Sequence, residues 1–186
     1  MFIGFINANE NPRDKKNYTT VISEIEEPKH SITIPFLQND FVGFKEALAF
    51  KESQGKYRVV NSLGYLGKYQ FGAATLERFQ IYNTNSFLKN PELQEQVFIA
   101  YCKVNKWILR KDIKRSVGKI IDGVKITESG ILAAAHLGGA GNVKKFLRSN
   151  GKLNCSDAYG TSLKSYMKNF GGYDVSSIQA DRKPTL

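Results

Sequence analysis

Glu52 is the acidic residue whose surroundings best suit chemistry. It precedes a Ser-Gln-Gly turn at 53–55, within a stretch, residues 49–76, that is rich in Gly, Tyr and Gln. A helical pattern of apolar residues begins at Phe41 and stops at this turn, so Glu52 is expected in the last turn of a helix. The macrodipole there disfavours a charged carboxyl, which suits a group that donates a proton. Glu52 is therefore a candidate general acid, and an ordinary surface glutamate is the alternative.

Three short motifs follow one another along the chain: Glu-Ser-Gln-Gly at 52–55, GKYQFG at 67–72 and LAAAHLGGAGNV at 132–143. In type and order they resemble the motifs of the soluble lytic transglycosylases and goose-type lysozymes. The run at 52–55 is similar to the E-S-x-G motif, whose Glu is the catalytic acid/base of that family. The run GKYQFG at 67–72 is similar to the second motif, G-L-M-Q-x-x, which lines the sugar cleft. The run LAAAHLGGAGNV at 132–143 is similar to the third, A-x-Y-N-x-G-x-G-x-V. The resemblance covers about residues 41–172.

The resemblance implies a catalytic Glu52 and a set of substrate-binding residues: Ser53, Tyr69, Gln70, His136 and Tyr166. Tyr69 stands where the family has Met, and His136 and Leu137 stand where it has Tyr-Asn. His136 is expected to replace the missing Asn as a hydrogen-bond donor to sugar, with a packed helix histidine as the alternative. Tyr166 is expected to reach back toward the Glu52 carboxylate, with a core tyrosine as the alternative.

The reaction that the resemblance implies is cleavage of the MurNAc–GlcNAc β-1,4 bond of peptidoglycan. A lytic transglycosylase needs one carboxylate, because the N-acetyl group assists and the 6-hydroxyl of the muramic sugar attacks C1 to leave a 1,6-anhydro end. A muramidase, the hydrolytic alternative, needs a second acid. Glu77 is the first candidate for it, ahead of Glu128 and Asp157. No second acid is strongly marked, which favours the transglycosylase. A non-catalytic basic domain that binds glycan or nucleic acid is the third hypothesis.

Four tyrosines offer flat faces and hydroxyls to a sugar, with core packing as the alternative for at least half of them: Tyr57, Tyr65, Tyr69 and Tyr159. The net charge of +10 points to an anionic partner, and it is uneven, because residues 1–40 carry four basic and six acidic side chains. The run from Lys103 to Lys125 holds eight Lys and Arg. The expected partner is the peptidoglycan glycan strand, and no nucleic acid is expected.

Composition excludes several classes of protein. The chain is 41% hydrophobic and 24% charged, as ordinary globular domains are, and it has no stretch long and apolar enough for a transmembrane helix. Its two cysteines, Cys102 and Cys155, suit no zinc motif, so we expect no metal and no cofactor. Two free thiols are expected, with a Cys102–Cys155 bridge as the alternative. The start, 1–8, is apolar but too short for a secretory signal. A bacteriolytic monomer that acts on the cell wall, by an export route that the sequence does not reveal, is expected.

The elements that must position these residues form an α+β fold that is mainly α. Residues 1–40 are predicted to be an N-terminal arm or linker, and 41–186 a lysozyme-like catalytic domain. A small β-hairpin or a tight β-like loop is expected at 57–70, beside the catalytic helix, because Asn and Gly interrupt its apolar residues. Helices are expected at 41–54, 73–81, from 90 to about 108, 111–121, 128–137, 142–149 and 162–170.

Overall fold

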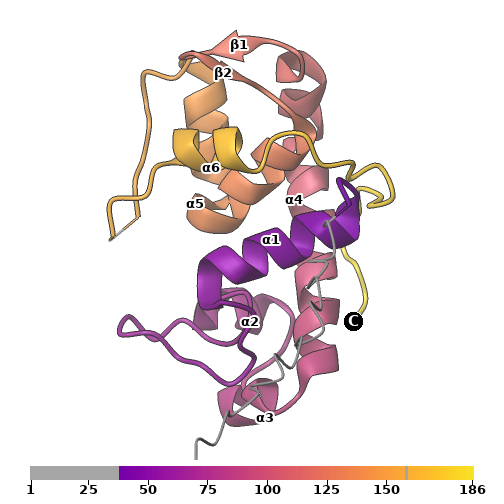
Figure 1. Ribbon diagram of the computed structural model, residues 1–186. Coiled ribbons are helices and arrows are strands. Elements are labelled where there is room, and N and C mark those ends of the chain that lie inside the picture. The colour runs from indigo at the N-terminus through magenta and orange to yellow at the C-terminus, as the bar shows by residue number, and fades with distance from the viewer. Residues whose placement is uncertain (1–37, 158) are drawn as a thin grey trace, which may run out of the picture. The chain divides into compact units, whose positions relative to one another are not determined.

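The computed structural model describes residues 38–157 and 159–186, and the predicted arm at 1–40 falls almost wholly outside them. In the described part, six helices and one two-stranded antiparallel sheet follow each other along the chain (Figure 1). Their bounds are α1 Phe41–Ser53, α2 Ala73–Arg78, α3 Thr84–Leu88, α4 Pro91–Ser116, β1 Ile120–Ile121, β2 Val124–Lys125, α5 Glu128–Arg148 and α6 Leu163–Asn169. The fold is mainly helical with a small sheet, which confirms the predicted class.

Helix α1 begins and ends where its sequence predicts. The side chain of Asp40 accepts a hydrogen bond from the backbone N–H of Gly43 at 2.8 Å and so caps the first turn. At the other end Gln54 adopts a left-handed conformation with φ 58°, which stops the helix. Glu52 therefore lies in the last turn of α1, as predicted.

Helix α4 is longer than predicted, and the chain after it is a hairpin. Asn90 caps it and Pro91 occupies its first position, as expected, but it then runs through 26 residues without a break at 109–111. The helix predicted to reach residue 121 is wrong beyond Ser116. Gly118 has a positive φ of 88°, and the β-branched residues that follow pair as β1 with β2.

The segment between α1 and α2 folds as a tight loop with isolated β-bridges, which is the second of the two structures that the sequence predicted there. Leu66 bridges both Val60 and Phe71, so the chain turns back twice in a few residues. Gly64 and Gly67, with φ of 82° and 73°, supply these turns. The small sheet of the fold is instead β1–β2, so of the two predicted structures the regular hairpin is wrong and the tight β-like loop is present.

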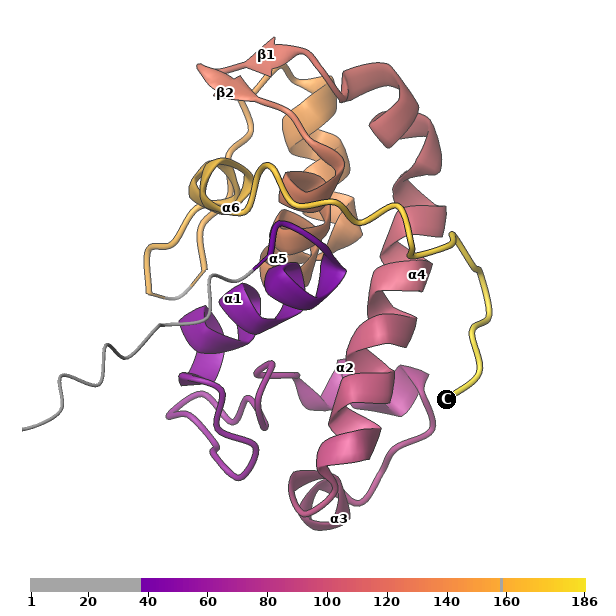
Figure 2. The ribbon, with the colours of Figure 1, turned by 45° about the vertical axis from the view of Figure 1, so that its right-hand side comes forward.

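Helix α5 is bent at the glycine pair where the sequence predicted that one helix ends. Gly139 has φ 77° and ψ 153°, so the helix axis changes direction there. The first half packs closely against α6. At Gly130 the two backbones are so close that an added β-carbon would lie 2.5 Å from the backbone oxygen of Met167. Figure 2 shows α5 between α6 and α4. The bend brings the middle of α5 to the end of α1.

The structure also bears on the cysteines, on membrane-spanning helices and on metal sites. Cys102 is buried and Cys155 half-buried, and both are free thiols, as predicted. Burial raises the pKa of the Cys102 thiol, which keeps it protonated.

Across 38–157 and 159–186, no helix combines the length and apolar character needed to cross a membrane. The same residues contain no cluster of three His, Cys, Asp or Glu that could hold a metal ion.

Candidate active site

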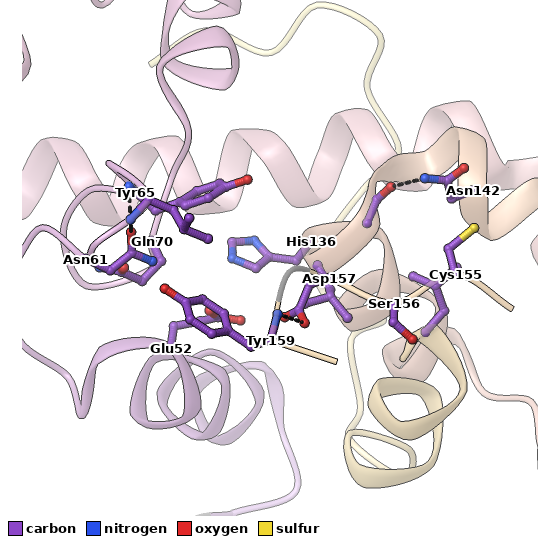
Figure 3. Close-up of a pocket in the computed structure, with 14 residues that line it drawn as sticks. Glu52, Asn61, Tyr65, Gln70, His136, Asn142, Cys155, Ser156, Asp157 and Tyr159 are labelled. Carbon is purple, nitrogen blue, oxygen red and sulfur yellow. Dashed lines mark hydrogen bonds between the residues drawn. The ribbon is translucent and has the colours of Figure 1, made fainter. Parts of the chain in front are cut away.

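A pocket of about 230 Å³ opens beside Glu52. Its walls come from the end of α1, the α1–α2 loop, the bend of α5 and the segment before α6, which Figure 3 shows converging on one space. Its polar and aromatic lining includes Glu52, Gln70, His136, Asn142, Asp157 and Tyr159. Three of the predicted site residues, Glu52, Gln70 and His136, are thus brought together in one pocket.

Tyr166 contacts the Glu52 carboxylate directly. Its hydroxyl donates a hydrogen bond to Oε1 of Glu52 at 2.7 Å, although the two residues are 114 positions apart. Tyr166 is buried at 3% exposure and packs against Phe170, while Glu52 is half-buried. Burial, and then the Glu52 charge, raise the pKa of Tyr166, so its hydroxyl keeps its proton and acts as the donor. The predicted approach of Tyr166 to Glu52 is present in the structure.

Ser53 and Tyr69 were predicted to bind substrate, and the structure corrects both. The Ser53 hydroxyl donates to the backbone oxygen of Lys68 at 2.7 Å and ties the end of α1 to the following loop. Tyr69 is fully buried, stacks on Phe98 with ring centroids 4.1 Å apart, and donates its hydroxyl proton to Glu95. A ring enclosed in the core cannot contact a sugar. Both residues hold the loop beneath the pocket instead of lining it.

His136 lines the pocket, but its proton is already used inside the protein. Its Nε2 lies 2.7 Å from the backbone oxygen of Tyr69, and because a carbonyl only accepts, Nε2 carries the hydrogen. Burial lowers the pKa of His136, although Glu52 opposes this, so the ring is neutral near neutral pH. Nδ1 is then an acceptor, and it is buried without a partner among the described residues. The expected donor role toward sugar is therefore wrong for the neutral ring.

Glu77 lies outside the pocket, and a different acid lies within it. Glu77 is exposed on α2, whereas Asp157 lines the Glu52 pocket. Oδ1 of Asp157 accepts from the backbone N–H groups of Tyr159 at 2.9 Å and Thr161 at 2.7 Å. Of the candidates for a second acid, Asp157 therefore replaces Glu77 as the first, because it lines the pocket. A turn-forming Asp-x-x-Gly pattern marks Asp157 in the sequence, but nothing local places it near Glu52.

The remaining lining of the pocket includes tyrosines that the sequence singled out and asparagines that it did not. Two of the four candidate tyrosines, Tyr65 and Tyr159, line the pocket and are exposed. Asn61 and Asn142 also line it and were not singled out. The Asn142 side chain donates to the backbone oxygen of Gly138 at 3.0 Å, across the bend of α5. Asparagines in loops and bends are so common that no sequence signal separates these two.

A partly buried ionic cluster, in which Lys68 is the only fully buried charged side chain, anchors the loop that carries Gln70. The Glu95 carboxylate of α4 accepts four hydrogen bonds of 2.5 to 2.8 Å, from Lys45, Tyr57, Lys68 and Tyr69. Lys68 also donates to Glu46 of α1 at 2.8 Å. Burial alone raises the pKa of Glu95, but its hydrogen bonds with Lys45 and Lys68 outweigh this and lower it to about 2. This cluster joins α1, α4 and the loop, and its charged members are not among the residues that the sequence singled out.

Gln94 fixes the same loop through its backbone. Its Oε1 accepts from the N–H of Lys68 at 2.8 Å, and its Nε2 donates to the backbone oxygens of Tyr57 and Phe87. Gly67 lies directly against this amide, because a β-carbon there would be 2.2 Å from Oε1 of Gln94. At Gly67 the loop lies this close to α4 because the residue has no side chain.

Gly67→Ala is expected to lower the free energy of unfolding by at least about 3 kcal/mol, because it adds a clash with Gln94 to the strain of a positive φ. Gly64→Ala is the matched control, since its φ is 82° but nothing lies within 4 Å of the added carbon. The control is expected to cost about 1 to 2 kcal/mol. Urea unfolding of both variants measures this, and equal losses would contradict the packing role of Gly67.

Comparisons with models of protein families, with curated proteins and with solved structures find no match for this chain. The family resemblance therefore stays a prediction. A functional hypothesis for this pocket depends on its geometry and on the three motifs.

Proposed function

We propose that this protein cleaves the MurNAc–GlcNAc bond of peptidoglycan as a lytic transglycosylase, with Glu52 as general acid and base. The observation that carries the proposal is the Glu52 carboxylate at the edge of a polar, tyrosine-lined pocket, held by the hydroxyl of Tyr166. The three motifs support it, because two of them supply Gln70 and His136 to the same pocket. The cationic surface of the chain suits an anionic wall.

The geometry suggests which oxygen of Glu52 reacts. The Tyr166 hydroxyl donates to Oε1, so in the acid form that the first step requires, Oε2 is the oxygen that carries the proton. In the first step Oε2 gives this proton to the glycosidic oxygen, the C1–O bond breaks, and the N-acetyl group of the muramic sugar stabilises C1. In the second step the Glu52 carboxylate takes the proton of the 6-hydroxyl as that oxygen bonds to C1. The product is a 1,6-anhydro end, and Glu52 is again protonated.

A muramidase is the second candidate, because Asp157 shares the pocket with Glu52. In that reaction Glu52 still protonates the leaving oxygen, while Asp157 stabilises C1 or activates a water molecule. Two backbone N–H groups hold the Asp157 carboxylate in place, as a positioned catalytic carboxylate requires. The two candidates share the acid and differ only in what attacks C1.

Analysis of the products by mass spectrometry tests the proposal. Purified peptidoglycan is digested with the full chain, and the muropeptides are separated. Anhydromuramic ends, each lighter than a reducing end by one water, are the expected result. Reducing ends would overturn the transglycosylase in favour of the muramidase. No fragments at all, from a protein with a cooperative thermal transition, would overturn both.

Tyr166→Phe is expected to lower kcat on peptidoglycan by about tenfold or more, because Glu52 loses its charge-assisted hydrogen bond. KM is expected to change little, since Tyr166 is buried behind Glu52 and is absent from the pocket lining. Tyr173→Phe is the control, because Tyr173 packs edge-on against Phe44 away from Glu52. A kcat equal to that of the control would argue against a positioning role for Tyr166.

A further inference from the structure

A cationic face lies on α4, on the side that turns away from the Glu52 pocket. With 3.6 residues per turn, Lys103, Trp107 and Lys114 fall on one side of the helix, and Tyr101, which lines a pocket beside His136, falls on the opposite side. The C-terminal segment runs alongside α4 in Figure 2 and adds two cations. We call this surface the Trp107 face; its members are Lys103, Trp107, Arg110, Lys111, Lys114, Arg182 and Lys183.

Two guanidinium groups from distant parts of the chain meet at the Trp107 ring. The Cζ atom of Arg110 lies 4.2 Å from the ring centroid, and that of Arg182 lies 5.3 Å from it. Arg110 also donates to the backbone oxygen of Trp107 at 2.8 Å. Cation–π contacts of this kind orient both guanidinium groups before any ligand arrives, which lowers the entropy lost on binding.

Hydrogen bonds hold the C-terminal segment in this position. The N–H of Asp181 donates to the backbone oxygen of Lys103 at 3.2 Å, and Lys106 donates to the backbone oxygen of Val175 at 3.2 Å. The N–H of Lys183 donates to Oδ1 of Asp181 at 2.9 Å, which shapes the chain around Arg182. The second guanidinium is therefore placed by the fold.

The cations of the Trp107 face have no acidic partner in the described part of the chain. Ion pairs are present nearby, but they use other cations: Lys106 pairs with Glu128, and Arg115 and Arg148 pair with Asp112. Arg110, Lys111, Lys114, Arg182 and Lys183 are all exposed. From Lys103 to Lys114 the row is about 16 Å long, at about 1.5 Å per residue. Such a row suits a ligand with repeated negative charges.

We propose that the Trp107 face binds the phosphodiester groups of a linear polyol-phosphate polymer of the bacterial wall, and so holds the enzyme near its substrate. The planar guanidinium forks of Arg110 and Arg182 suit phosphate oxygens. The choice of a wall polymer rests on the proposed function, since phosphate chemistry alone is shared with nucleic acids.

Two features favour a polyol phosphate over a nucleic acid. Single strands bind by stacking bases on open aromatic rings, but Trp107 is half-buried and contacts both guanidinium groups. A helix that reads duplex DNA enters the major groove with its face free, but the C-terminal segment is hydrogen-bonded to α4 at Lys103. A flexible polymer without bases needs only spaced cations.

Binding of the full chain to poly(glycerol phosphate), measured by fluorescence anisotropy over a range of salt concentrations, tests this proposal. Arg110→Gln with Arg182→Gln is expected to weaken binding at least tenfold and to lower the slope of log Kd against log salt by about 1.5. Lys145→Gln with Lys152→Gln removes two exposed charges elsewhere and is the matched control, expected to change Kd less than about threefold. Equal losses in the two double variants would overturn the proposal.

Two further measurements distinguish recognition by the guanidinium groups from attraction by charge alone, and the polymer from a nucleic acid. Arg110→Lys with Arg182→Lys keeps the charge but not the fork, and it is expected to retain part of the salt dependence yet bind several times more weakly. Single-stranded DNA with the same number of phosphates is expected to bind more weakly than the polymer, and tighter binding would overturn the choice of partner. Glu52→Gln is expected to bind the polymer as wild type does, so this test stands apart from any failure of the cleavage proposal.

Discussion

Glu52→Gln is expected to lower the rate of peptidoglycan cleavage by at least about a thousandfold, while the protein stays folded. Glutamine can neither give a proton to the leaving oxygen nor take one back. Its amide oxygen can still accept the hydrogen bond from Tyr166, so the pocket should keep its shape. Release of soluble muropeptides from purified peptidoglycan measures the rate, and thermal unfolding checks the fold.

Glu77→Gln is the matched control for this experiment. It makes the same chemical change in an exposed side chain of α2 that lies outside the pocket, so activity within about twofold of wild type is expected. If Glu52→Gln cleaves peptidoglycan as fast as this control does, Glu52 is not the acid. Asp157→Asn adds a further test, since asparagine can accept the same turn hydrogen bonds. Retained activity is expected for a transglycosylase and lost activity for a muramidase.

Glu95→Gln is expected to lower the free energy of unfolding by about 3 to 5 kcal/mol. Glu95 balances the charges of Lys45 and Lys68, and the Lys68 side chain is only 5% exposed. The substitution leaves the Lys68 ammonium with Glu46, a more exposed carboxylate, as its one anionic partner among the described residues, and it turns an amide N–H₂ toward donors. Glu92→Gln is the control, because Glu92 lies in the exposed first turn of the same helix and contributes about 1 kcal/mol or less. Urea unfolding near neutral pH measures both variants.

The same carboxylate is expected to make the protein acid-sensitive. The pKa of Glu95 is about 2 in the folded chain against an ordinary value of 4.5. A lowered pKa stabilises the fold fully above the ordinary value, and this contribution is lost as pH falls from 4.5 toward 2. It amounts to about 3 kcal/mol. The stability gap between wild type and Glu95→Gln should therefore narrow over that window. A gap that is constant with pH would contradict the ionised Glu95 in this cluster.

Loss of the contacts that Lys68 or Tyr69 makes with Glu95 should also affect the site, because both residues belong to the loop beneath the pocket. Lys68 and Tyr69 bind Glu95 with their side chains, while their backbone oxygens accept from Ser53 and His136. Ser53 follows Glu52 in α1, and His136 lines the pocket. The ionic cluster on one side of the loop thus supports the pocket on the other. We therefore expect substitutions in this cluster to change the stability of the fold and the shape of the pocket together.

What the sequence determined by itself is local. The Asp40 cap and the turn after Ser53 place Glu52 in the last turn of α1, and the glycine pair before Ala140 bends α5. These features depend on backbone preferences and on contacts a few residues apart, so short patterns predict the ends of α1 and locate the glycine pair, although they indicated a helix end there and not a bend. The mainly helical class follows from the spacing of apolar residues in the same way.

Only the tertiary structure decided which side chains face the pocket. The sequence marks Tyr69 and Tyr65 alike, yet one is buried against Phe98 and the other is exposed in the lining. Asp157 meets the Glu52 pocket from a segment more than a hundred residues away, as Tyr166 meets Glu52 itself. Such contacts are set by how whole elements pack to bury their apolar faces and satisfy their hydrogen bonds. That balance is a property of the entire fold, and no short pattern carries it.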